Sequence, residues 1–328
     1  MSRIIVLLVF QSLIASLGIG LINTGMAQDK IGVTLYRYDY NFIQLMCSEL
    51  ERNAAKHQLS VLMNNAQNSQ LVQNNQVETL LEQKVKVLAV NLVDQNAWRT
   101  VIGKAIDRNV PIILFNKAPG RQALESYDHA YYIGSDPSEI AKLQAEMVAK
   151  QWKVNPQFDL NKDGKIQYAL LKGENGHPDA ELRTRVVSQQ LEQLIPGSQM
   201  LALESAQWQT GIAKEKVSAW FATPHKEKIE VIIANNDAMA IGALEAAATQ
   251  GKLGPIYGVD GIPAALNLIK MGALAGTIQN DWVSQSKAIL TFSENLAKGK
   301  KVDEGTAWQL KDRVLRVPYK MIEKNDLK

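Results

Sequence analysis

The chain has 328 residues, 46% hydrophobic and 21% charged, and 36 basic against 33 acidic residues give a net charge of +3. This composition is typical of a globular protein of about two domains, and near-neutrality gives no electrostatic reason to expect nucleic acid or an anionic membrane as partner. A single cysteine, Cys47, excludes an intrachain disulfide, a cysteine-rich zinc site and an iron–sulfur cluster.

The first 27 residues predict a secretory signal. Arg3 precedes an apolar stretch that runs to about Ile22, and Gly25-Met26-Ala27 places small residues where a signal peptidase cleaves. An uncleaved anchor helix is the alternative, but polar residues and glycines interrupt the stretch and no cluster of charges follows it. We therefore expect cleavage after Ala27 and a soluble mature chain in a bacterial periplasm.

From Ile31 onward, short apolar runs alternate with amphipathic segments. The runs that predict buried strands are, in chain order, 31–35, 87–92, 111–115, 131–133, 168–171, 230–234, 256–259 and 274–278. Apolar spacing predicts helices near 43–50, 97–108, 140–147, 180–194, 238–248, 263–269 and 289–296. This alternation predicts an α/β fold with parallel sheets, and the units are too many for one sheet. We expect two lobes joined by several short crossings, because no Pro-, Gly- or Ser-rich linker separates them.

Polar clusters that contain Asn or Asp follow five of the predicted strands, where open α/β sheets usually bind ligands. They are Asp39–Phe42, Asn116–Lys117, Asn235–Asp237, Gly258–Asp260 and Gln279–Asp281. Capping of the next helix explains a single cluster equally well, and we favour capping for Asp237 and Asp281. Five such clusters together favour a ligand that presents many hydroxyl groups.

The segment His177–Arg183 is the most informative local group. Pro178 predicts a helix start, which places Asp179 and Arg183 at i and i+4 on one face. A surface ion pair worth about 0.3–0.5 kcal/mol is one interpretation. A polar anchor for a ligand is the other. His and Asp together also fit acid–base catalysis, but the chain has no Gly-x-Ser-x-Gly, His-Glu-x-x-His or Walker motif.

Residues 159–167 match the first nine positions of an EF-hand-type calcium loop. The matching ligands are Asp159, Asn161, Asp163, the Lys165 carbonyl and Gln167, with Gly164 at the turn. Position 12 is Leu170 and not Glu, so a further carboxylate must come from elsewhere, and Glu230 is our candidate. A plain Asx-rich turn is an equally good interpretation.

Two aromatic residues, Phe42 and Trp208, lie near polar segments and outside the apolar runs. Packing in the core is the default for an aromatic side chain. Flat aromatic faces also sandwich the C–H faces of a pyranose, while polar groups at the rim bind its hydroxyls.

These segments together resemble the periplasmic glucose/galactose-binding proteins of bacterial ABC uptake and sugar chemotaxis. The similar segments span nearly the whole mature chain and are Ile31–Tyr36, Asn91–Asp94, Phe115–Lys117, Asp159–Gln167, Lys172–Asp179, Ile233–Ala240 and Ala273–Gly276. The resemblance implies two Rossmann-like lobes joined by a three-segment hinge near residues 135, 280 and 316. The first lobe would comprise 28–135 and 280–315, and the second 136–279 and 316–328.

The resemblance also implies residue roles. Phe42 and Trp208 would stack on the sugar, with hydrogen bonds from Asn116, His177, Asp179, Arg183, Asn236, Asp260 and Asn280. Ca²⁺ would be bound by Asp159, Asn161, Asp163, Lys165, Gln167 and Glu230. The implied protein is a monomer without enzymatic activity. It binds glucose or galactose, delivers it to an ABC permease of the inner membrane, and has a chemoreceptor as a second partner.

Tyr40 departs from the family pattern. The family has a second aspartate there, and that carboxylate receives the 4-hydroxyl that distinguishes glucose from galactose. A tyrosine would close part of the pocket, change the preferred epimer, or turn away. This departure makes a periplasmic sensor for a different polyol or signal ligand the first alternative. A calcium-assisted glycoside hydrolase using Asp179 and Asp260 is the second. A sugar-responsive transcription regulator is excluded because a signal segment stands where its DNA-binding helices would be.

Overall fold

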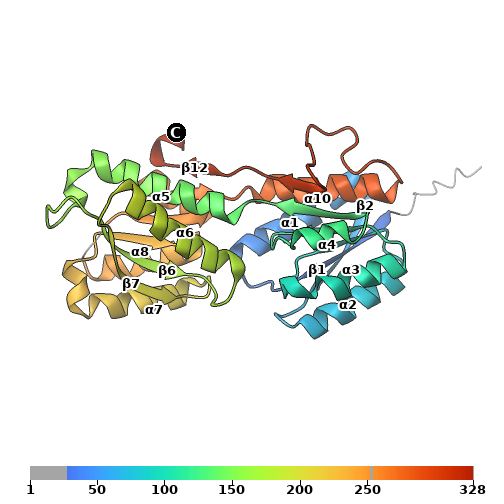
Figure 1. The fold of residues 1–328 in the computed structure, drawn as a ribbon, viewed down its shortest axis with the longest axis horizontal. Helices are drawn as coiled ribbons and strands as arrows, with labels where there is room; N and C mark the ends of the chain where they lie inside the picture. Colours follow the sequence, from blue (N-terminus) through green and yellow to red (C-terminus); the bar gives the residue numbers. More distant parts are fainter. Residues whose placement is uncertain (1–27, 252–253, 328) are drawn as a thin grey trace, which may run out of the picture.

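The computed structural model describes residues 28–251 and 254–327, so the predicted signal segment lies outside the described residues. Two six-stranded sheets lie side by side along the molecule (Figure 1). The first has the strand order β11 (Val314–Arg316), β5 (Ala130–Gly134), β4 (Ile112–Phe115), β3 (Val87–Val90), β1 (Asp29–Leu35) and β2 (Leu59–Asn65). The second has the order β12 (Lys320–Ile322), β10 (Gly276–Gln279), β9 (Ile256–Asp260), β8 (Val231–Ala234), β6 (Gln167–Lys172) and β7 (Gln199–Ser205).

Neighbouring strands are parallel in both sheets, apart from the antiparallel pair of β10 and β12. We call each sheet, with the helices packed on it, a lobe. The first lobe contains α1 (Asn41–Ala54), α2 (Gln70–Glu82), α3 (Trp98–Asp107), α4 (Arg121–Glu125) and α10 (Trp282–Ala297). The second contains α5 (Pro137–Val154), α6 (Pro178–Leu194), α7 (Thr210–Phe221), α8 (Asp237–Thr249) and α9 (Pro263–Met271). Short 3₁₀ turns are η1 (Ala55–His57), η2 (Gln95–Ala97), η3 (Pro156–Phe158), η4 (Pro224–Glu227) and η5 (Lys324–Asp326).

Both faces of each sheet are covered, which explains the continuous apolar runs of the central strands. In β3, Val87 and Ala89 pack in the core on the α1 and α10 side, whereas Leu88 and Val90 pack with α2 and α3. The second sheet follows the same alternation, with α5 and α6 on one face and α7 and α8 on the other. Cys47 is fully buried in α1, and burial raises the pKa of its thiol to about 12.

The chain passes between the sheets three times: between β5 and α5, between β10 and α10, and between β11 and β12. Two of these crossings are tied together. Ser135 Oγ donates to the Val317 carbonyl at 2.6 Å, and Arg316 Nη1 donates to the Ser135 carbonyl at 3.0 Å. In the described part of the chain, no helix combines the length and hydropathy needed to span a bilayer.

The sequence does not predict β2, β7, β11 or β12, and it also misses α2, α7 and the short α4. The four strands lie at sheet edges, where one side lacks a partner and the apolar run is short or interrupted. In β7 the exposed Met200 and Leu203 remove the pattern of a buried strand. The α2 segment is rich in Gln and Asn, which weakens its amphipathic signal.

Candidate ligand-binding site

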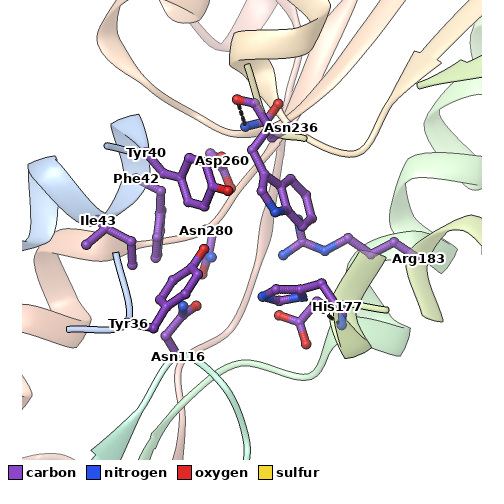
Figure 2. A pocket seen from close by; sticks show the side chains of 12 residues that line it. Tyr36, Tyr40, Phe42, Ile43, Asn116, His177, Arg183, Asn236, Asp260 and Asn280 are labelled. Atoms are coloured by element: carbon purple, nitrogen blue, oxygen red, sulfur yellow. Dashed lines mark hydrogen bonds between the residues drawn. The ribbon is translucent and has the colours of Figure 1, made fainter. Parts of the chain in front are cut away.

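All ten residues predicted to bind a ligand line one cavity between the two lobes (Figure 2). The lining residues are Tyr36, Tyr40, Phe42, Ile43, Asn116, His177, Asp179, Arg183, Trp208, Asn236, Asp260 and Asn280. The cavity has about 430 Å³ of empty space, part of which is open to solvent.

The side chains converge because the carboxyl ends of strands in both sheets point toward the space between the lobes. Residues 36–43 follow β1, and Asn116 follows β4. On the other side, His177 to Arg183 follow β6 and begin α6, while Trp208, Asn236 and Asp260 come from the ends of β7, β8 and β9. Figure 2 shows Tyr36, Phe42 and Asn116 on one side of the cavity and Arg183 and His177 on the other.

Aromatic side chains from both lobes line the cavity. Phe42 comes from the first lobe and Trp208, 8% exposed, from the second. A Cβ at Gly173 would collide with the Trp208 indole, so the ring lies directly against the backbone there. The Trp208 ring also meets the His177 ring edge-to-face, with centroids 5.3 Å apart and an interplanar angle of 80°. The indole is therefore held in one orientation.

His177 is a neutral hydrogen-bond donor to the cavity. Its Nδ1 accepts the backbone N–H of Asp179 at 3.2 Å and caps α6, so the ring proton belongs on Nε2. Burial, together with the nearby positive charges of Lys117 and Arg183, lowers the His177 pKa to about 3. The imidazole therefore stays uncharged at neutral pH.

Arg183 is a buried cation between two acidic side chains. Its Nη1 donates to the Asn235 carbonyl at 2.9 Å, and the residue is only 6% exposed. The interpretation of Arg183 as part of a surface ion pair is therefore wrong, because α6 turns it toward the cavity. Burial raises the pKa of Asp179 and of Asp260, and the guanidinium opposes this rise at both carboxyl groups.

Several features of the cavity are typical of a binding site. Asn116, Trp208 and Asp260 adopt positive φ angles of 63°, 64° and 119°, a strain that clusters at functional sites. Among the described residues, Tyr40 Oη, Trp208 Nε1 and Arg183 Nε are buried without a hydrogen-bond partner. Because buried polar atoms are almost always paired, these atoms are suited to a bound molecule.

The two lobes contact each other beside the cavity. Arg37 of the first lobe and Glu174 of the second form an ion pair at 3.6 Å, and Asn68 Nδ2 donates to Glu174 Oε1 at 3.5 Å. The Tyr36 and His177 rings, also from opposite lobes, have centroids 6.1 Å apart. Tyr36 and Ile43 also line the cavity, but no polar cluster or aromatic signal in the sequence predicts them as site residues. Tyr36 ends the first of the similar segments.

The predicted capping aspartates behave differently from each other. Asp281 Oδ1 accepts the Ser284 N–H at 2.9 Å, so its prediction as a helix cap is confirmed. The prediction for Asp237 is wrong. Asn236 caps α8 by accepting the Met239 N–H at 2.9 Å, and Asp237, the first helical residue, directs its carboxylate to other partners.

The predicted calcium residues meet at loop 159–167. Asp163 Oδ2 accepts from Asn161 Nδ2 at 3.2 Å and from Gln167 Nε2 at 2.9 Å, and Asp159 Oδ2 accepts the Gly164 N–H at 2.9 Å. Glu230 reaches the loop from the start of β8 and accepts the backbone N–H groups of Leu160 and Gln167 at 2.8 and 3.0 Å. Within the described residues, no group of three or more His, Cys, Asp and Glu is placed to hold a metal ion. The Asn161 and Gln167 amide oxygens and the Lys165 carbonyl are further possible oxygen donors in this loop.

Two α/β lobes with a polar cavity between them define a binding protein of the two-lobe type. Residues 31–301 match the family model of a periplasmic binding protein domain, and the chain belongs to this family. The predicted fold and the interpretation as a periplasmic substrate-binding protein are thereby confirmed.

Individual proteins similar to this chain support the family assignment. MglB of Haemophilus influenzae, a D-galactose/methyl-galactoside binding periplasmic protein, is 51% identical over 302 residues, which are 92% of this chain and 91% of MglB. A xylitol-binding protein of Mycolicibacterium smegmatis is 27% identical over 83% of this chain and 73% of its own length. A solute binding protein of a Bacillus halodurans ABC transporter, solved with myo-inositol, aligns with a TM-score of 0.76 at 26% identity. That alignment covers 93% of this chain and 98% of the solved one.

Proposed function

We propose that this protein binds a single neutral monosaccharide, D-galactose or D-glucose, in the cavity between its lobes. The observation that carries the proposal is the pairing of aromatic walls, Phe42 and Trp208, with polar side chains from both lobes. One cation, Arg183, lies among two carboxyl groups there, an arrangement that disfavours an anionic ligand. The 51% identity to a galactose-binding relative supports the same sugar class.

The proposed mechanism is closure of the two lobes around the sugar. The hydrogen-bonding groups are divided between the lobes, with Asn116 on the first and His177 to Arg183 on the second. Only a closed arrangement lets one sugar contact both sets, so ligand binding shifts the population toward that arrangement. The closed form would be delivered to an ABC permease of the inner membrane and read by a chemoreceptor. No catalytic step is part of this proposal.

Tyr40 is the residue we expect to set the preference between the two epimers. Its hydroxyl is buried at the cavity without a partner among the described residues, and the family carboxylate is absent. Isothermal titration of ligand-stripped protein with D-galactose and with D-glucose should give sub-millimolar binding of at least one sugar. Folded protein that binds neither would contradict the proposed ligand.

Removal of the Tyr40 hydroxyl tests its contact with the sugar. Tyr40→Phe should weaken binding of the preferred sugar by about 0.5–1.5 kcal/mol, roughly 2- to 13-fold, the usual net worth of one hydrogen bond. Tyr38→Phe is the matched control, because Tyr38 is 37% exposed and does not line the cavity. Equal constants for both variants and the unaltered protein would show that the Tyr40 hydroxyl does not contact the ligand.

We further propose that loop 159–167 binds Ca²⁺. The donor set is suitable, since Asp159, Asp163 and Glu230 supply carboxylates and Asn161, Gln167 and the Lys165 carbonyl supply neutral oxygens. The Asn161 and Gln167 amides both face Asp163, and a half-turn of each amide exchanges its nitrogen for its oxygen. The bound ion would cross-link the loop to the start of β8.

Chelation should therefore lower the melting temperature of the protein, and added Ca²⁺ should restore it, because a ligand of the folded state stabilises that state. Differential scanning calorimetry with and without chelator measures the effect. Asp163→Ala should melt at the same temperature in both conditions. Superimposable melting curves of the unaltered protein would leave the segment as an Asx-rich turn.

A further inference from the structure

Asp237 is a buried acidic residue that was predicted to cap α8 but does not. Its Oδ2 accepts two backbone N–H groups, from Gly261 at 2.7 Å and from Ile262 at 2.9 Å. Its Oδ1 accepts the Thr277 hydroxyl at 2.7 Å. The residue is fully buried and does not line the cavity, so its carboxylate connects the start of α8 to the segment just after β9.

That segment directly follows Asp260, the last residue of β9 and a cavity residue with a strained backbone. Asp260 has φ 119°, a strained conformation for a non-glycine residue that persists only where its surroundings enforce it. The two N–H groups bound by Asp237 belong to the residues that immediately follow Asp260. These two hydrogen bonds fix the backbone that follows Asp260. The backbone conformation of Asp260 in turn sets the direction of the Asp260 carboxylate.

The Asp237 carboxylate also depends on a glycine in β9. Gly258 lies beside Asp237, and a Cβ at Gly258 would collide with Asp237 Oδ1. The missing side chain at this position of β9 allows the carboxylate to reach across to residues 261 and 262. Asn235 and Asn236 act in a similar way nearby, since they bind Arg183 and the Trp208 carbonyl.

We propose that Asp237 is a positioning residue, which holds Asp260 in its strained backbone conformation and so directs the Asp260 carboxylate to the ligand. This inference rests on the proposed function for its effect on affinity, but its structural part does not. Burial raises the Asp237 pKa to about 7, so a neutral side chain is compatible with the site. In Asp237→Asn, the amide oxygen can still accept the N–H groups of Gly261 and Ile262. The amide nitrogen can donate to the Thr277 hydroxyl.

The first test is a double-mutant cycle measured by titration with the preferred sugar. Asp237→Ala should weaken binding by about tenfold or more, and Asp237→Asn should stay within about threefold of the unaltered protein. In an Asp260→Ala background, Asp237→Ala should change affinity less than about twofold, because its effect passes through Asp260. The same loss in both backgrounds would overturn the proposal. Asp237→Ser replaces Asp237→Ala in the cycle if the latter does not fold.

Thr277→Val is the matched control, because it removes one hydrogen bond to the same carboxylate but none to residues 261 and 262. It should lower the melting temperature and leave affinity unchanged. An affinity loss equal to that of Asp237→Ala would contradict the role of the two backbone bonds.

The second test needs no ligand. In a crystal structure of the unliganded Asp237→Ala protein, φ of Asp260 should return to a negative value, while Asp237→Asn keeps it positive. A positive φ retained in Asp237→Ala would overturn the proposal. If the unaltered protein bound no sugar, the proposed function would fail, and this measurement would still decide the role of Asp237.

Discussion

Arg183→Met is expected to weaken sugar binding by about 2–5 kcal/mol, or roughly 30- to 5,000-fold, the range for truncating a buried charge that is hydrogen-bonded. Arg183 is the main cation that opposes the raised pKa values of Asp179 and Asp260, with a smaller contribution from Lys117 at Asp179. Without Arg183, both carboxyl groups protonate closer to neutral pH and lose acceptor capacity for hydroxyl groups. The affinity of the variant should therefore fall further on acidification than that of the unaltered protein.

Arg185→Met provides a control from the same helix. Arg185 lies two residues further along α6 and is exposed, so its replacement removes the same charge without opening the cavity. Titration calorimetry between pH 5 and pH 8 compares the variants. Similar losses for Arg183→Met and Arg185→Met would mean that the long-range field of the helix, and not contact at the site, supports binding.

Trp208→Ala is expected to weaken binding by about 1–3 kcal/mol, roughly 5- to 150-fold, by analogy with aromatic stacking on nucleic-acid bases. The indole forms one wall of the cavity, is held by Gly173 and His177, and has an unpaired Nε1 among the described residues. Its loss removes the stacking surface and one donor together. Trp208→Phe should retain part of the affinity, because a flat ring remains.

Loss of a buried tryptophan also lowers the stability of the protein. The control must therefore lose an equally buried tryptophan away from the cavity. Trp220→Ala is suitable, because Trp220 is 7% exposed, lies in α7 and does not line the cavity. Both variants should melt earlier, but only Trp208→Ala should bind more weakly. An unchanged dissociation constant in Trp208→Ala would assign the indole to core packing alone.

The central strands and the cavity residues could be predicted because both leave local signals. Strands β3, β4 and β8 are continuous apolar runs, and the polar residues after them fall where parallel strands present their carboxyl ends. Edge strands such as β7 were not predicted, because their half-exposed residues do not form a continuous apolar run. Asp237 was misjudged for a different reason. Its position before a helix suggested a cap, whereas its partners lie 24 and 25 residues further along the chain.

The division of the last strands between the sheets has a consequence for the order of folding. Strand β11 completes an edge of the first sheet and β12 an edge of the second, with only residues 317–319 between them. During synthesis, the first lobe therefore lacks its outer strand until residue 316 has emerged, although its other strands appear before residue 135. Domains encoded in one continuous stretch generally fold one after another, beginning with the N-terminal one. Here the short segment 314–322 completes the sheets of both lobes almost simultaneously.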